Sequence, residues 1–281
     1  LHNTTTGNSL IQRDLTGENP IEKVAADAFA GSNAIEYLQL QRDASGNYYM
    51  LTNRRLRDSN NVFSDYHRVH KFDSAGVLVA QSIFLPKESG SVNLVVTDSI
   101  AYISMTTSVA ITGNGFDDEV LNDEGHQAVR VAALRSDDLS IKWTRLVQSN
   151  DQYGQDSIAA GMVLAGNVLY VGVSTSGELY YNDALLTTPA ATVNLVALHA
   201  GDGSELAHKS WITDPNFQPD QYNGLLNLVK SMSIGPNDSL FFTGWIKLNF
   251  NQTTYANANS IESYVLKAQL SATASTLPVE S

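Results

Sequence analysis

Four segments of this chain repeat one pattern, in which an apolar strand ends in a short polar turn and a second apolar strand follows. The aligned apolar positions are Phe72, Leu134, Leu198 and Leu270, and an aromatic position upstream of each recurs at Tyr49, Tyr102, Tyr170 and Phe242. A repeat built from short strands cannot bury both faces of its sheet alone, so neighbouring repeats have to stack. The repeat therefore favours a radial all-β architecture.

Each repeat is predicted to form four antiparallel strands joined by turns. In the third repeat, strands are expected over 158–164 and 168–172, near 195–198, and over 206–212. Aromatic and β-branched residues bounded by turn formers are typical of strands. The chain is therefore predicted to be all-β, a β-propeller of four-stranded antiparallel blades, with a β-sandwich as the alternative. The four repeats span about 35–85, 90–147, 157–212 and 228–277.

The N-terminal segment, 1–34, precedes the predicted blades of 35–281 and holds only half a repeat. Residues 10–17 and 20–24 have the pattern of two consecutive strands. Propellers often close by pairing strands from the two ends of the chain. The half-repeat therefore either closes the ring, or belongs with further propeller blades elsewhere in a larger chain.

Composition excludes several classes of partner. The 281 residues include 17 basic and 29 acidic side chains, for a net charge of −12. Nucleic acid is not expected as a partner, because phosphate binding requires a basic surface. The chain has no cysteine, which rules out disulfides and thiolate metal sites. No membrane span is predicted, since no apolar run approaches the roughly 18 residues of a membrane helix.

The third repeat carries a family resemblance. It reads as a strand leading to Gly172, a loop, a strand ending at Leu198, the Gly201-Asp202-Gly203 turn and a strand with Trp211. This order resembles the β-propeller repeat of bacterial secreted and surface proteins and, more distantly, the quinoprotein (pyrroloquinoline quinone) repeat. The resemblance implies an exported bacterial protein, extracellular, on the cell surface or in the periplasm. Quinoprotein activity is not expected, because it needs a vicinal disulfide.

Unequal connections predict a binding face. Within each repeat the first and third connections are short, whereas the second is long, at 53–65, 106–127, 174–192 and 246–262. Long loops in a compact domain are often functional. Tyrosines beside carboxylates suit sugar binding, because ring faces stack on apolar sugar faces; the alternative is that these aromatics only pin the loops. The candidate ligand-binding residues are Phe63, Tyr66, Phe116, Tyr153, Tyr180, Tyr181, Phe217 and Tyr222.

One long loop is acidic. Asp117, Asp118, Asn122 and Asp123 supply the hard oxygen atoms that calcium prefers. Their spacing does not match an EF-hand, and a solvated acidic loop is the alternative interpretation. Apart from calcium, no cofactor is predicted.

Catalytic signals are weak. His67 and His70 are three apart on one strand and so point to opposite faces, and only His126 is placed on the proposed face. No nucleophile elbow, zinc-protease helix or phosphate loop occurs. The favoured interpretation is a non-enzymatic binding or scaffold module for a polysaccharide or a protein. A carbohydrate-active hydrolase or lyase on the same scaffold is the main alternative, and a structural spacer is the third.

Overall fold

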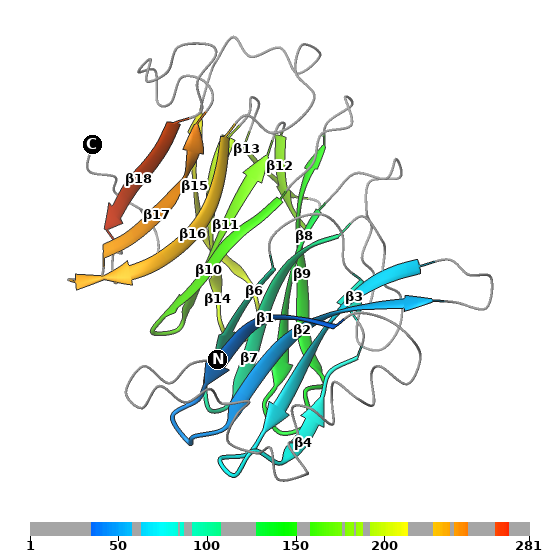
Figure 1. Cartoon of the computed structure of the whole chain (residues 1–281). Coiled ribbons are helices and arrows are strands. Elements are labelled where there is room, and N and C mark those ends of the chain that lie inside the picture. Colours follow the sequence, from blue (N-terminus) through cyan, green and yellow to red (C-terminus); the bar gives the residue numbers. More distant parts are fainter. Residues whose placement is uncertain are drawn as a thin grey trace. The chain divides into compact units, whose positions relative to one another are not determined.

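The described residues form strands joined by turns. The computed structural model describes residues 35–57, 63–83, 85–86, 92–107, 128–150, 158–175, 178–182, 184–187, 192–212, 227–236, 239–246 and 262–269. These residues form strands β1 to β18 and no α-helix (Figure 1). Within this part of the chain, no helix has the length and apolarity needed to cross a membrane. The all-β prediction is confirmed.

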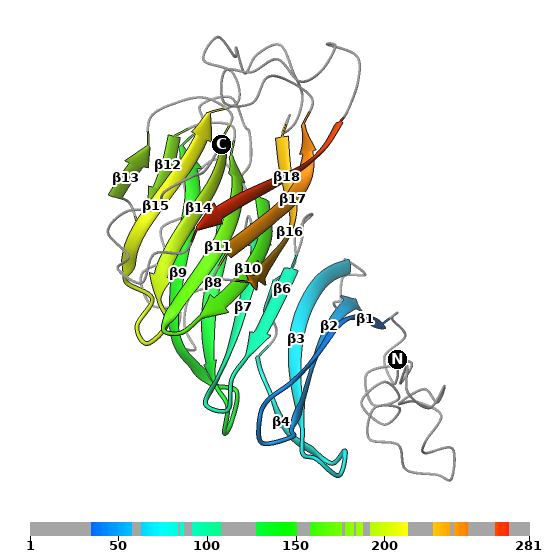
Figure 2. The same ribbon diagram turned by 90° about the vertical axis from the view of Figure 1, so that its left-hand side faces the viewer.

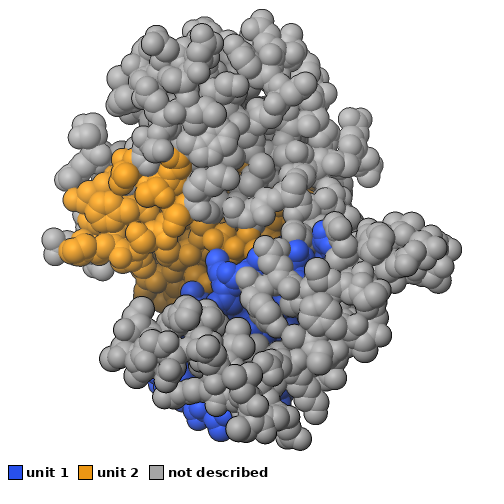
Figure 3. Space-filling view, in the orientation of Figure 1, with its two compact units in different colours: residues 1–87, 96–101, 135–140 blue, residues 88–95, 102–134, 141–281 orange. Residues whose placement is uncertain are grey.

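The chain divides into two compact units (Figure 3). The first comprises Leu1–Lys87, Val96–Ala101 and Arg135–Ser140, and the second comprises Glu88–Val95, Tyr102–Leu134 and Ile141–Ser281. The strands form four antiparallel sheets, numbered here in chain order. Sheet 1 belongs to the first unit, and sheets 3 and 4 belong to the second. Sheet 2 belongs mostly to the second unit. Its two short turns, within Val96–Ala101 and Arg135–Ser140, belong to the first unit.

Sheet 1 follows the predicted strand order. Its path is β1-β2-β3-β4, and the short strand β5 also pairs with β3. Tyr49 and Leu51 of its second strand are fully buried, as the apolar pattern of that segment predicts. The strands are β1 (Ile35–Arg42), β2 (Tyr48–Arg57), β3 (Phe63–Phe72), β4 (Leu78–Gln81) and β5 (Leu85–Pro86).

Sheets 3 and 4 repeat this order. Sheet 3 runs β10-β11-β14-β15 and sheet 4 runs β16-β17-β18. The strand predicted near Leu277 lies outside the described residues. The strands are β10 (Ile158–Ala165), β11 (Val168–Thr175), β14 (Thr192–His199), β15 (Glu205–Ile212), β16 (Asn227–Gly235), β17 (Ser239–Ile246) and β18 (Glu262–Gln269).

Sheet 2 differs, because a hairpin from a later repeat extends it. Its order is β13-β12-β9-β8-β7-β6, so β12 and β13 continue the sheet beyond β9 (Figure 2). The segment 174–192 was predicted to be a loop, and this part of the prediction was wrong. Leu179 and Tyr181 alternate with Tyr180 and are buried, which is the pattern of a strand. The strands are β6 (Val92–Val96), β7 (Ile100–Thr107), β8 (Ala128–Arg135), β9 (Ile141–Asn150), β12 (Glu178–Tyr181) and β13 (Ala184–Thr187).

The repeat is visible in the geometry of the turns after the third strand of sheets 1, 2 and 3. In each, the pairing register shifts at the repeated apolar position, between Lys71 and Phe72, Ala133 and Leu134, and Ala197 and Leu198. Such a β-bulge bends the strand and increases its local twist. Each turn also holds one residue at positive φ: Gly76 at 85°, Leu139 at 58° and Gly203 at 73°.

An apolar core joins sheets 3 and 4. It contains Tyr170, Val193, Leu195, Ala197 and Trp211 of sheet 3 and Met232, Leu240 and Phe242 of sheet 4. A Cβ atom at Gly161 would lie 2.7 Å from Cγ of Met232, so the glycine permits β16 to approach β10 closely. The core therefore depends on a small residue in β10 as well as on the repeated aromatic positions.

Candidate functional site

The two ends of sheet 3 differ in how the chain leaves them. At one end, called the turn end, β10 joins β11 and β14 joins β15 through short turns. At the opposite end, called the loop end, β11 ends at Thr175 and β14 begins at Thr192. The same two kinds of end occur in sheet 2, whose strands are paired in the same order.

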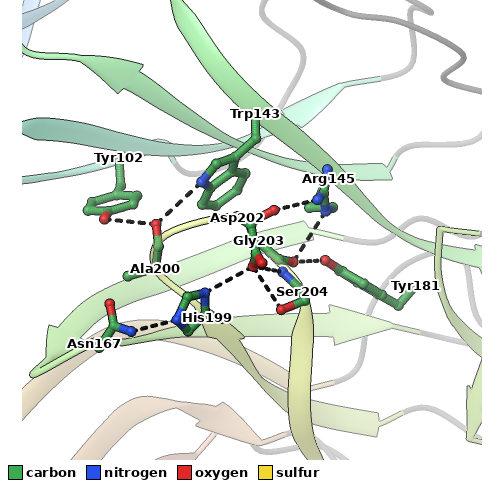
Figure 4. A network of polar contacts seen from close by, with 10 residues as sticks. All are labelled: Tyr102, Trp143, Arg145, Asn167, Tyr181, His199, Ala200, Asp202, Gly203 and Ser204. Atoms are coloured by element: carbon green, nitrogen blue, oxygen red, sulfur yellow. Dashed lines mark hydrogen bonds and ion pairs between the residues drawn. The ribbon is translucent and has the colours of Figure 1, made fainter.

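A polar network lies at the turn end of sheet 3 (Figure 4). The Asp202 carboxylate accepts hydrogen bonds from the backbone N–H of Ser204 at 2.9 Å and from its hydroxyl at 2.8 Å. His199 contacts the same carboxylate oxygen through Nδ1 at 3.0 Å, and its Nε2 lies 2.6 Å from Nδ2 of Asn167. Three residue types used in hydrolytic catalysis are thus within hydrogen-bonding distance.

The geometry of this network does not fit nucleophilic catalysis. In a catalytic triad the histidine lies between the nucleophile and the acid, whereas Asp202 lies between Ser204 and His199. The backbone N–H of Ser204, then its hydroxyl, then His199 lower the pKa of Asp202 to about 2. A carboxylate with so low a pKa is a weak general base near neutral pH. The network therefore stabilises a turn.

The same turn is bound firmly to sheet 2. The Tyr102 hydroxyl and the Trp143 indole donate to the carbonyl of Ala200, at 3.0 and 3.3 Å. Burial raises the pKa of Tyr102, and also raises the pKa of Tyr181 to about 12. Both phenols stay protonated at neutral pH and can keep donating.

Gly203 is the second attachment point of this turn. The Tyr181 hydroxyl and Nε of Arg145, the latter at 3.2 Å, donate to the Gly203 carbonyl. Another guanidinium nitrogen of Arg145 donates to the carbonyl of Asp202, and its guanidinium lies 5.7 Å from the Trp143 ring centroid. We call the contacts of Tyr102, Trp143, Arg145 and Tyr181 with this turn the clamp.

A matching attachment recurs within the first compact unit. Nζ of Lys71 donates to the carbonyl of Ser136 at 2.6 Å, and Ser136 stands two residues after Leu134, as Ala200 stands two after Leu198. The backbone N–H of Ser136 donates to Ser99 at 3.0 Å, as that of Ala200 donates to Asn167 at 3.0 Å. The turn after Leu134 and the turn after Leu198 are thus held by the same kinds of hydrogen bond.

Buried polar side chains and the half-buried Ser210 lie at the loop end of sheets 2 and 3. In sheet 3, Nδ2 of Asn194 donates to Oγ1 of Thr175 at 2.9 Å, and Oγ of Ser210 donates to Oδ1 of Asn194 at 2.6 Å. In sheet 2, Arg130 is fully buried and its Nη1 lies 3.5 Å from Oγ1 of Thr107. Satisfied buried polar groups hold their surroundings in one arrangement. We call Thr107, Arg130, Thr175, Asn194 and Ser210 the polar floor.

Sheet 1 also has buried polar side chains, in the middle of β3 and toward the end of that strand at Phe72. His67 and His70 are 3% and 5% exposed, and Nε2 of His70 lies 3.0 Å from Oγ1 of Thr52. Both histidines are buried in β3, where residues three apart face opposite sides of the sheet. They do not form a paired site.

Only some of the predicted site residues lie in the described part of the chain. Tyr66 in β3 and Tyr180 in β12 are half-buried, whereas Tyr181 is 7% exposed and belongs to the clamp. Phe63 is the first residue of β3. Outside the described residues lie Phe116, Asp117, Asp118, Asn122, Asp123, His126, Tyr153, Phe217 and Tyr222. No group of three His, Cys, Asp or Glu side chains suited to a metal occurs among the residues described.

Two important sets of residues were missed in the sequence. Arg130 interrupts the apolar run Val129 to Leu134, and a charge inside such a run was a readable signal. The clamp residues Trp143 and Arg145 gave no such signal, because their partners lie in another repeat.

Neither a protein-family model nor a curated protein matches the chain.

Asp202 should titrate with a pKa of about 2, below its usual 3.8, because Ser204 and His199 stabilise the carboxylate. Because the pKa of Asp202 is lower in the folded protein than in the unfolded chain, the ionised carboxylate stabilises the folded state. This stabilisation is complete above pH 3.8 and is lost as the pH falls through about 2. Ser204→Ala removes the hydroxyl donor and should raise the pKa. Carboxyl ¹³C shifts measured against pH check both values, and titration of the wild-type group near 3.8 would contradict the network.

Proposed function

We propose that this protein is a non-enzymatic binding module of an exported bacterial protein, with a polysaccharide as its ligand. The observation that carries the proposal is the contrast between the two ends of sheets 2 and 3. The turn end is closed by short turns and the clamp, while the loop end has the polar floor and the long connections. Ligand sites are commonly built on loops that a rigid scaffold positions.

We further propose that the four sheets are blades of a β-propeller. The common strand order of the sheets, the bulge repeated in sheets 1, 2 and 3, and the stacking of sheet 4 on sheet 3 support this arrangement. In a propeller, connections of one kind gather on one face. The long connections of sheets 2, 3 and 4, all within the second compact unit, would then lie on one face.

An aromatic ring at the loop end favours a sugar over a protein. Tyr180 is half-buried in β12, at the loop end of sheet 2. Ring faces of this kind stack on the apolar faces of sugars. The polar floor supports the scaffold and does not touch the ligand, because four of its members are at most 1% exposed.

Tyr180→Ala is expected to weaken polysaccharide binding about tenfold, because it removes an aromatic stacking surface. Binding is measured by affinity electrophoresis and on a glycan array. The matched control is His208→Ala, a substitution of an exposed side chain near the turn end, which should leave binding unchanged.

Two results would contradict this function. One is an array and a set of soluble polysaccharides that all fail to bind the wild type. The other is an equal loss of binding in the two variants. A third outcome is that the wild type binds a purified protein but no glycan, and that Tyr180→Ala abolishes this binding. The ligand would then be a protein and not a polysaccharide.

A further inference from the structure

His199 is held between two side chains at the turn end of sheet 3 (Figure 4). Its Nδ1 lies 3.0 Å from Oδ1 of Asp202, and its Nε2 lies 2.6 Å from Nδ2 of Asn167. The two partners differ in chemistry, because an ionised carboxylate only accepts hydrogen bonds, whereas a carboxamide has one end that donates and one end that accepts. The contact of His199 with Asp202 is therefore fixed in its polarity, and the contact with Asn167 can reverse.

These contacts specify one form of the neutral imidazole. Hydrogen bonds from Ser204 and then from His199 lower the pKa of Asp202 to about 2, so the carboxylate is ionised near neutral pH and Nδ1 of His199 carries the hydrogen. Nε2 then accepts a hydrogen bond from Nδ2 of Asn167. A hydrogen on Nε2 would place two donors 2.6 Å apart, so this arrangement belongs to the neutral ring alone.

The imidazole ring itself has little room to turn over. A Cβ atom at Gly201 would lie 2.9 Å from Cε1 of His199, which shows how closely the ring packs on that glycine. Asn167, by contrast, has an exposed side chain, and its backbone is held separately, because its carbonyl accepts from the backbone N–H of Ala200 at 3.0 Å. The carboxamide can therefore reverse while the backbone stays in place.

We propose that His199 and Asn167 form a proton-operated switch at the turn end. When Nε2 of His199 takes up a proton from solvent, the Asn167 carboxamide turns over and its Oδ1 accepts the new hydrogen. The exposed end of this carboxamide then changes from an acceptor to a donor. Protonation of one ring thereby reverses the hydrogen-bonding character of the surface next to it.

Other charged groups near the switch have partners of their own. Arg145 of β9 donates to carbonyl groups of the same turn, one of them that of Asp202. Glu205 of β15 contacts Nδ1 of His208 at 3.0 Å. The turn between β10 and β11, which contains the carboxamide, carries no charged side chain. The response to a proton therefore falls to the carboxamide, the one partner that can reverse its polarity.

The test uses NMR of the intact ¹⁵N- and ¹³C-labelled protein between about pH 8 and about pH 5, the range over which histidines usually change charge. At the upper pH, neutral His199 should carry its hydrogen on Nδ1, and a scalar coupling should join Nδ2 of Asn167 to Nε2 of His199. As His199 becomes protonated, this coupling should disappear and the Asn167 side-chain carbonyl signal should shift. A neutral ring with its hydrogen on Nε2, or Asn167 signals that ignore the protonation of His199, would overturn the switch.

His208 is the internal control. It also contacts a carboxylate through Nδ1, but its contacts within the described residues include no carboxamide. Its protonation should therefore leave the Asn167 side-chain signals unchanged. If these signals follow His208 instead of His199, the assignment of the switch is wrong.

Asn167→Asp supplies a second readout, because a carboxylate only accepts hydrogen bonds. At about pH 8 a larger share of His199 should be protonated in this variant than in the wild type, since both ring nitrogens would then face acceptors. The isosteric control Asn167→Leu removes the partner of Nε2 without adding a charge and should not increase that share. Equal protonation of His199 in the wild type and in Asn167→Asp would show that Asn167 does not govern Nε2, and would reject the proposal whatever ligand the protein binds.

Discussion

Gly203→Ala is expected to lower the free energy of unfolding by about 3 kcal/mol, because it combines backbone strain with a steric clash. Gly203 has a φ of 73°, a conformation that disfavours any side chain. A Cβ atom there would lie 2.8 Å from Cε3 of Trp143 and 3.0 Å from Cγ of Arg145. The substitution therefore pushes the turn off the clamp.

Urea unfolding followed by tryptophan fluorescence measures this effect, since all three tryptophans belong to the second compact unit. Gly166→Ala is the matched control, because Gly166 has a φ of 57° but no atom lies within 4 Å of the position that a Cβ would take. Gly166→Ala should lower the free energy of unfolding by about 1 kcal/mol, which is the cost of a side chain in the left-handed backbone conformation. Equal midpoints for the two variants would show that the clamp does not confine Gly203.

Gly161→Ala is expected to destabilise the second compact unit by about 2 kcal/mol, through overpacking between sheets 3 and 4. The added methyl group would lie 2.7 Å from Cγ and 3.0 Å from the backbone nitrogen of Met232. The sheets would have to move apart, and the contact of Trp211 with Phe242 would loosen. The same urea measurement reports the change.

A double-mutant cycle with Met232→Ala tests the cause. Shortening Met232 removes the closest atom but leaves its backbone nitrogen, so part of the penalty of Gly161→Ala should disappear in the double variant. Strictly additive free energies would show that the clash with Met232 is not the source of the loss.

Much of the fold could be predicted from local pattern. The strands around Tyr49, Tyr102 and Tyr170, and the short turns after Phe72, Leu134 and Leu198, occur where the sequence placed them. Alternation of apolar residues and the chemistry of turn residues act over a few positions, so both can be recognised in a single repeat. For that reason the sequence predicts the fold class.

The candidate site was harder to predict from the sequence, as Tyr180 and Tyr181 show. Both were predicted to bind ligand from their place in a predicted loop. They lie on opposite faces of β12, where Tyr181 binds the carbonyl of Gly203 and Tyr180 stays half-buried. Which of two adjacent tyrosines is buried depends on the strand that β12 pairs with, and that strand is β9 of the preceding repeat.

Repetition, strand positions and the short turns follow from the chain alone, since each depends on residues close together in sequence. The clamp depends on partners far apart in the sequence, as in the bond from Tyr102 to Ala200 across 98 positions. Such partners are brought together by the stacking of whole sheets, in which each sheet buries a face that it cannot bury alone. Tertiary packing therefore separates the structural joint at the turn end from the candidate ligand site at the loop end.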